Sequence, residues 1–245
     1  LYDKETQTFH MWYANYDVGA WGGSKRKTKT RRTPYMMSYA YSKDGTHWTK
    51  PLLEKIPYLG YKKTNVVMLG NKTVQEFRVI HTPQYLRDEG KEKFMLWYRD
   101  AWPGYSKSVG VAYSDNGIDW RKPNLGLVDY AGQGKDNNLF NIPGHDMSVF
   151  IGPDAPPSHR YRGTVCTGSC HETSRPENLE TYGFYTVHSS DGLSWEYDKK
   201  TPQWYHADNI TSVYHPGQRR AIVMLKANPL QTINGMRRRA FMGSE

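Results

Sequence analysis

Side chains that could bind a ligand stand at the ends of aromatic-rich segments of the sequence. Arg99 directly follows the segment MLWY. A guanidinium at the end of a strand can hold a carboxylate or sulfate through two parallel hydrogen bonds, or it can pair with Asp100 or Asp88 within the fold. Trp21 in GAWGG and Trp102 in DAWPG have the glycine-containing surroundings typical of loops. Loop indoles of this kind either stack on the apolar face of a sugar ring or pack beneath their own loop.

The charge of the chain favours an anionic partner. The formal net charge is +9, and part of it comes from one run, SKRKTKTRR, at Ser24 to Arg32. This run is either a solvated loop or a patch that attracts an acidic or sulfated glycan. No nucleic-acid motif accompanies it, and no stretch approaches 18 apolar residues. We therefore expect neither a nucleic acid nor a membrane as a partner.

The two cysteines, Cys166 and Cys170 in CTGSCHE, allow three arrangements. The Thr-Gly-Ser insert could turn the chain enough for a disulfide, or both thiols could stay reduced. A metal site that included His171 would lack a second cluster of ligands, so we expect no bound metal there.

One turn motif occurs three times in the sequence, and its spacing indicates how the chain is organised. The three phrases are YSKDGTHWTKP, YSDNGIDWRKP and HSSDGLSWEYD, which begin at residues 41, 113 and 188. They share the pattern Ser-x-Asp/Asn-Gly-x-x-Trp, and their tryptophans are 72 and 75 residues apart. Asp-Gly and Asn-Gly supply the positive φ angles of a tight hairpin turn. We interpret Trp48, Trp120 and Trp195 as structural anchors of these hairpins.

Strand-like segments precede each turn, and no helical periodicity of useful length interrupts them. TPYMMSYAY, SVGVAYS and YGFYTVHS lie directly before the turns, and FHMWYAN, KFMLWYRD and RYRGTVC lie further upstream. An aromatic content of 14% also favours strands. Repeated units of about four antiparallel strands predict an all-β fold, namely a single-domain β-propeller.

The turns divide the chain into four units, and the natural completion is a five-bladed β-propeller. We expect a first blade at about 1–62 without its innermost strand, complete blades at about 74–130 and 144–199, and a truncated fourth blade at about 205–245. The sequence begins without a start Met or a signal peptide. We therefore expect a fragment or a processed chain whose export signal would lie upstream.

The segments MWY…YAYSKDGTHWTKP, MLWYRD…VAYSDNGIDWRKPNLGL and KDNNLF resemble the five-bladed β-propeller glycoside hydrolases related to families 32 and 43, in particular uncharacterised family-32-like bacterial members. The resemblance covers essentially the whole chain, blade by blade. It implies an active site at the mouth of the central channel, with one carboxylate from the innermost strand of each of the first three blades. These would act as nucleophile or base, as transition-state stabiliser and as general acid.

Carried over residue by residue, the resemblance gives three candidate catalytic carboxylates. Asp146 in HDMSVF falls at the general-acid position, where the family has Glu. The second-blade Arg-Asp-Pro of the family aligns with residues 81–83, so that Thr82 stands where Asp is expected and Glu76 is the nearest acidic replacement. Asp208 in HADNIT would orient a sugar hydroxyl or tune the acid. The first-blade carboxylate would lie upstream of the sequence given.

Further side chains are candidate substrate ligands at the same mouth. His81 would line the channel and bind a sugar hydroxyl. His145 precedes Asp146, and strand alternation sends the two side chains to opposite sides unless the strand is irregular. Arg238 is the middle residue of an arginine triplet, where alternation places it opposite both of its neighbours. The other candidates for this role are Arg99, Trp21 and Trp102.

We therefore expect a glycoside hydrolase that acts on an oligo- or polysaccharide, with an acidic or sulfated glycan favoured by the basic run. The resemblance implies no cofactor and is compatible with a structural Ca²⁺ ion in the channel. It also implies a secreted or periplasmic protein, whereas no feature indicates an oligomeric state. Two alternatives stay open, namely a non-catalytic glycan-binding propeller, favoured by Thr82, and a propeller that serves as a protein-interaction platform.

Overall fold

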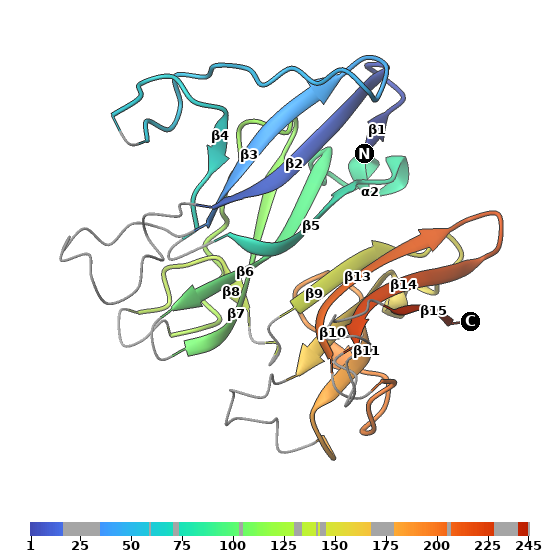
Figure 1. The fold of residues 1–245 in the computed structure, drawn as a ribbon. Helices are drawn as coiled ribbons and strands as arrows, with labels where there is room; N and C mark the ends of the chain where they lie inside the picture. Colours follow the sequence, from blue (N-terminus) through green and yellow to red (C-terminus); the bar gives the residue numbers. More distant parts are fainter. Residues whose placement is uncertain are drawn as a thin grey trace, which may run out of the picture.

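The described part of the chain is built almost entirely of antiparallel β-strands in the computed structural model (Figure 1). It comprises residues 1–16, 35–58, 60–70, 74–102, 105–129, 134–140, 142, 146–167, 179–204, 207–227 and 240–244. The helical elements within these ranges are α2 (Gln84–Asp88) and the 3₁₀ turn η1 (Pro157–His159). Neither of them has the length or the apolar character that crossing a membrane requires.

The strands form four sheets that follow one another along the chain, and within each sheet neighbouring strands are hydrogen-bonded in chain order. The first sheet contains β1 (Tyr2–Asp3), β2 (Thr8–Tyr16), β3 (Tyr35–Ser42) and β4 (Val66–Met68). The second contains β5 (Gln75–His81), β6 (Phe94–Trp102), β7 (Tyr105–Ser114) and β8 (Leu139–Phe140). The third contains β9 (Asp146–Ile151), β10 (Tyr161–Thr167), β11 (Gly183–Ser189) and β12 (Glu196–Tyr197), and the fourth contains β13 (Ala207–His215), β14 (Arg220–Ala227) and β15 (Ala240–Ser244). These four sheets are the blades of a β-propeller, which confirms the predicted fold class.

All four blades share one register. The turn serine at the end of the third strand of each blade pairs with a residue near the start of the second strand. These pairs are Phe9↔Ser42, Phe94↔Ser114 and Tyr161↔Ser189. In the fourth blade the same pairing joins Ala221 and Ser244, so Ser244 stands at the predicted turn-serine position. Equivalent positions in different blades can therefore be identified from the strand pairing alone.

The first blade differs from the sequence prediction, because it has an innermost strand where none was expected. This strand, β1, pairs Tyr2 with Phe9 and Asp3 with Thr8. Two residues are too few to show an alternation of polar and apolar side chains, so no pattern marked a separate strand there. The outermost strands β4 and β8 lie past the blade ends expected near residues 62 and 130. A fifth blade stays a prediction.

Buried side chains pack neighbouring blades against each other. One cluster joins the first and second blades, a larger one joins the second and third, and a small one around Phe184 and Val223 joins the third and fourth. Cys166 is fully buried in the small cluster. Cys170 and His171 lie outside the described residues, so the arrangement of the cysteines stays open.

The three turns are held by their own side chains. The glycine amide donates to the turn serine Oγ at 2.9 Å for Gly45, 2.8 Å for Gly117 and 2.9 Å for Gly192. These glycines have φ angles of 78°, 75° and 80°, in the left-handed region that other residues adopt at a cost. The Asp or Asn side chain before each glycine accepts two further backbone amides, which completes the turn.

Indole groups use these turns to connect neighbouring blades. Trp12 of the first blade donates to the carbonyl of Gly117 in the second at 2.7 Å, and Trp97 of the second donates to that of Gly192 in the third at 3.0 Å. The turn tryptophans Trp120 and Trp195 donate to the same two carbonyls. Each carbonyl therefore accepts two indole N–H groups, one from its own blade and one from the preceding blade.

Replacement of Gly117 by Ala is expected to destabilise the protein by about 2–4 kcal/mol. The new Cβ would lie 2.6 Å from Trp12 Cζ2, and the positive φ adds strain of about 1–2 kcal/mol to the cost of overpacking. Gly126→Ala is the matched control, because Gly126 also has a positive φ of 66° but no neighbour within 4 Å of its Cβ position. Urea denaturation would measure the free energy of unfolding of both variants. Equal losses would show that the contact with Trp12 contributes nothing to the destabilisation.

Candidate functional site

The innermost strands give the propeller two distinct ends. β5, β9 and β13 are the innermost strands of the second, third and fourth blades, and β9 packs against both of the others. Each runs in the same sense within its blade, because each leads directly into the second strand as an antiparallel neighbour. We call the end where these strands start the carboxylate end, and the opposite end, which carries the three glycine turns, the turn end.

The three candidate carboxylates all lie at the carboxylate end. Asp146 is the first residue of β9 and pairs with Cys166 of β10. Glu76 is the second residue of β5, and Asp208 is the second residue of β13. Three acidic residues thus occupy the first or second position of three neighbouring innermost strands, so their backbones lie at the same end of the propeller.

Irregular strand pairing accompanies two of these carboxylates. The register of β5 on β6 shifts between Gln75 and Arg78, and that of β13 on β14 shifts between Ala207 and Ile210. Glu76 and Asp208 therefore lie within bulged segments. Bulges redirect side chains and are over-represented beside active sites. Their occurrence at the same end of two blades is unexpected for strands that serve only as scaffold.

Thr82 does not occupy the position of the second-blade aspartate, so the alignment through residues 81–83 is wrong. It follows the last residue of β5 and is fully buried at the turn end. Proline cannot donate to a strand ladder, so Thr82 and Pro83 end the strand before α2 instead of opening it. The sequence alignment matched a proline at the wrong end of the strand.

Strand pairing identifies the true counterpart of Asp146. Asp146 pairs with Cys166 in the third blade, and Gln75 pairs with Arg99 in the second. Cys166 and Arg99 are equivalent, because each lies five residues after the partner of its turn serine. Gln75 therefore corresponds to Asp146, and Glu76 is the acidic residue next to that position.

Of the candidate ligands, Arg99 and Trp102 lie on β6 toward the carboxylate end. Arg99 is half-buried and pairs with Gln75, and Trp102 ends β6, where it pairs with Tyr105. His81 ends β5 at the turn end, about 20 Å along the strand at the usual rise per residue, and is not brought to the carboxylates. Trp21, His145 and Arg238 lie outside the described residues.

Arg78 is a candidate that sequence reasoning missed. It lies on β5 beyond the bulge that contains Glu76, and its Nε is buried without a hydrogen-bond partner among the described residues. Burial lowers the pKa of this guanidinium, although it stays charged. The available signal was a lone arginine within the strand-like segment EFRVIH, two residues after Glu76.

Solved structures that resemble the chain include carbohydrate-active enzymes. An N-acetylgalactosamine deacetylase from F. plautii, in complex with blood group B trisaccharide, matches 93% of this chain at 18% identity with a TM-score of 0.57. The two proteins share a fold. A GH43 β-1,3-galactosidase matches 92% of this chain at 16% identity with a TM-score of 0.36. The chain spans 61% and 51% of the lengths of these two proteins. No protein-family model and no curated protein matches it.

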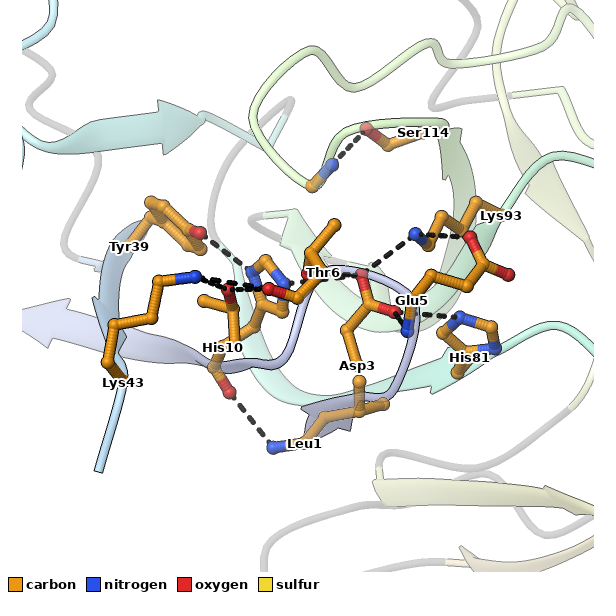
Figure 2. A network of polar contacts seen from close by, with 12 residues as sticks. Leu1, Asp3, Glu5, Thr6, His10, Tyr39, Lys43, His81, Lys93 and Ser114 are labelled. Atoms are coloured by element: carbon orange, nitrogen blue, oxygen red, sulfur yellow. Dashed lines mark hydrogen bonds and ion pairs between the residues drawn. The ribbon is translucent and has the colours of Figure 1, made fainter. Parts of the chain in front are cut away.

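At the turn end of this propeller, a buried carboxylate connects the first two blades (Figure 2). Asp3 of β1 is 1% exposed and accepts hydrogen bonds from Glu5 N at 3.0 Å and Thr6 Oγ1 at 2.8 Å. Lys93 Nζ lies 2.8 Å from Asp3 Oδ2 and 2.9 Å from Glu5 Oε2. Burial acts to raise the pKa of Asp3, but Lys93 and the other two donors outweigh it and hold the pKa well below its usual value. Asp3 is therefore an ionised structural anchor.

Two imidazoles lie beside this anchor. His10 Nε2 and His81 Nε2 are 3.7 and 3.8 Å from Asp3 carboxylate oxygens, and His10 Nδ1 is 2.7 Å from the Tyr39 hydroxyl. Burial lowers the pKa of both imidazoles, although Asp3 opposes this effect. Both are therefore neutral at pH 7. His81 belongs to this network, which the sequence did not indicate because Asp3 and Lys93 lie on different blades.

Proposed function

We propose that the protein is a glycoside hydrolase whose active site lies at the carboxylate end. The observation that carries this proposal is the position of Asp146, Glu76 and Asp208 at the starts of three neighbouring innermost strands. Glycosidic cleavage requires one carboxylic acid to protonate the leaving oxygen and a carboxylate to attack the sugar or activate water. Asp146, on the strand between the other two, acts as the general acid in this proposal.

Residues at the carboxylate end support a carbohydrate substrate. Arg99 supplies a guanidinium that suits bidentate binding of a carboxylate or sulfate, and Trp102 supplies an aromatic side chain of the kind that stacks on sugar rings. The enzyme with the same fold was solved with a trisaccharide, which supports a glycan ligand for this fold as well. The proposal does not depend on a specific relationship to family 32.

The basic run at Ser24 to Arg32 supports an anionic glycan. Tyr16 and Tyr35, the described residues on either side of positions 17–34, pair with each other across β2 and β3. In the shared register Tyr16 corresponds to Ala101 of the second blade, next to Trp102. The connection that contains the basic run therefore leaves and re-enters the first blade at the carboxylate end, where positive charge would attract an acidic substrate.

Deacetylation of an amino sugar is the second candidate reaction. The observation that favours it is the printed activity of the F. plautii enzyme, whose chain has the same fold. A non-catalytic glycan-binding propeller stays an alternative, and Thr82, which first favoured it, lies buried at the opposite end of β5 from Glu76.

A product screen with the full-length protein tests the proposal and separates the alternatives. Neutral, uronic-acid, sulfated and N-acetylated oligosaccharides would be incubated with the protein and analysed by mass spectrometry and by assays for reducing ends and acetate. We expect new reducing ends, with the highest rate on an anionic glycan. Acetate release with an intact glycan chain would identify a deacetylase, and saturable binding without any product would overturn hydrolysis.

A further inference from the structure

The third turn differs from the other two at its first and last positions. The phrase begins with Tyr and ends with Pro in the first two blades, but it begins with His188 and ends with Asp198 in the third. The turn itself is unchanged, because Gly192 N still donates to Ser189 Oγ at 2.9 Å. The hairpin therefore does not require the imidazole and the carboxylate, which indicates another role for them.

These two residues form a compact cluster with a second imidazole. His188 Nδ1 lies 2.6 Å from Asp198 Oδ1, and the ring of His159, in η1, stacks on the ring of His188 with centroids 3.8 Å apart. The side chains of His188 and Asp198 are 16% and 20% exposed, and His159 is half-buried. One ligand atom from each residue lies within 4.8 Å of the others.

We propose that His159, His188 and Asp198 bind a divalent transition-metal ion such as Zn²⁺ at the turn end of the third blade. Two imidazole nitrogens and one carboxylate oxygen are a ligand set typical of zinc sites that keep a fourth position for water or another ligand. Ser158 Oγ lies 2.9 Å from His159 Nδ1, so Nε2 of that ring is the nitrogen that binds the ion. Because a carboxylate only accepts hydrogen bonds, His188 Nδ1 carries the ring proton, and this proton moves to Nε2 when Nδ1 binds the metal.

A cavity beside the cluster provides access and room for the fourth ligand. It has a volume of about 570 Å³ between the third and fourth blades, and its lining includes His159, Asp198, Thr164 and Arg162. Thr164 stands three residues after the partner of its turn serine, the position of Trp12 and Trp97 in the other blades. A threonine fills much less space than an indole, so the space that is closed at the earlier junctions is open here.

Binding requires one ring to turn. The planes of the two imidazoles are 9° from parallel, whereas a metal lies near the plane of each ring that binds it. His188 is fixed on β11 by its bond to Asp198. His159 belongs to a three-residue 3₁₀ turn and lines the cavity, so it is the ring that reorients.

Metal titration of the full-length protein after EDTA treatment tests the site without any assay of enzyme activity. Calorimetry with Zn²⁺ and absorption spectroscopy with Co²⁺ should show one ion bound per chain. His159→Gln and His188→Tyr should each weaken binding at least tenfold. Tyr is chosen for position 188 because the other two turns carry it. Zn²⁺ should raise the Tm of the wild type but not of the His159→Gln variant.

Two control variants should bind the metal as the wild type does. His47 pairs with Asp44 at 2.7 Å in the first turn but belongs to no group of three potential metal ligands among the described residues, so His47→Ala should leave the affinity unchanged. Cys170→Ser removes the alternative metal site suggested by the cysteines and should also have no effect. The proposal is overturned if no saturable binding occurs, if both histidine variants bind as tightly as the wild type, or if only Cys170→Ser loses the ion.

Discussion

Replacement of Asp146 by Asn should lower the rate of glycan cleavage by about 10²–10⁴-fold, the usual contribution of a positioned general acid. Asn has nearly the same size and cannot protonate the leaving oxygen, so substrate binding and Tm should change little. Glu76→Gln and Asp208→Asn should also reduce turnover, because the proposed mechanism uses carboxylates from neighbouring strands. Measured kcat and KM for the three variants would show whether the loss is in chemistry or in binding.

The choice of substrate separates the acid from the other carboxylates. An aryl glycoside with an acidic phenol as leaving group needs little protonation, so Asp146→Asn should retain more activity on it than on a natural oligosaccharide. Glu76→Gln should lose activity on both substrates. Asp154→Asn is the matched control, because Asp154 lies in the same blade beyond the other end of β9, where it pairs with Arg219 at 3.3 Å. Equal losses in Asp154→Asn and Asp146→Asn would contradict an active site at the carboxylate end.

Replacement of Asp3 by Ala should destabilise the protein by about 3 kcal/mol, because it leaves Lys93 buried beside Glu5 alone. The Lys93 side chain is only 11% exposed, so solvent cannot replace the lost partner. Lys93→Met in the Asp3→Ala background should recover part of the loss, since it removes the unpaired charge. Chemical denaturation of the two single variants and the double variant would give the coupling energy, and simple additivity would show that the pair does not interact.

The same carboxylate gives a predicted acid limit of stability. Its folded-state pKa lies below the unfolded value near 3.9, so its contribution is complete at neutral pH and is lost as the pH falls from about 4 toward the folded-state pKa. The unfolding free energy of the wild type should therefore fall more steeply below pH 4 than that of Asp3→Asn. If the unfolding free energies of the two proteins fell in parallel with decreasing pH, Asp3 would not be the cause of the acid limit.

The repeated turns made the fold predictable from the sequence. The positions of the candidate catalytic residues along their strands were harder to predict. Ser-x-Asp/Asn-Gly-x-x-Trp is local chemistry, since the side-chain and backbone contacts that shape each turn lie within a few residues. Register along an innermost strand depends instead on pairing with residues far away and on bulges, so the alignment through Pro83 placed Thr82 at the aspartate position and left Glu76 as the nearest acidic replacement. Strand pairing corrected this, because Gln75 and Asp146 face equivalent partners.

Contacts between blades were also beyond the sequence. Trp12 and Trp97 lie within strands of the first and second blades, yet their N–H groups donate to turns of the next blade. The Asp3–Lys93 pair likewise joins two blades, and the His159–His188 stack joins two segments of the third blade that meet only through strand pairing. A sequence pattern reveals which residues repeat, but it does not reveal which residues of two repeats meet.

The indole contacts between blades have a direction. At the two junctions among the first three blades, the preceding blade supplies the indole donor and the following blade supplies the carbonyl acceptor, so these junctions are heterologous, like the head-to-tail contacts of a cyclic oligomer. The chain is thus a covalently linked set of pseudo-symmetric subunits, and the junction between the third and fourth blades breaks that symmetry. There, mutual hydrogen bonds between Ser148 and Ser212 replace the indole as the contact. A junction that lacks a packed aromatic ring offers less resistance when one blade slides past the next. Relative motion of the blades should therefore concentrate at the junction between the third and fourth blades.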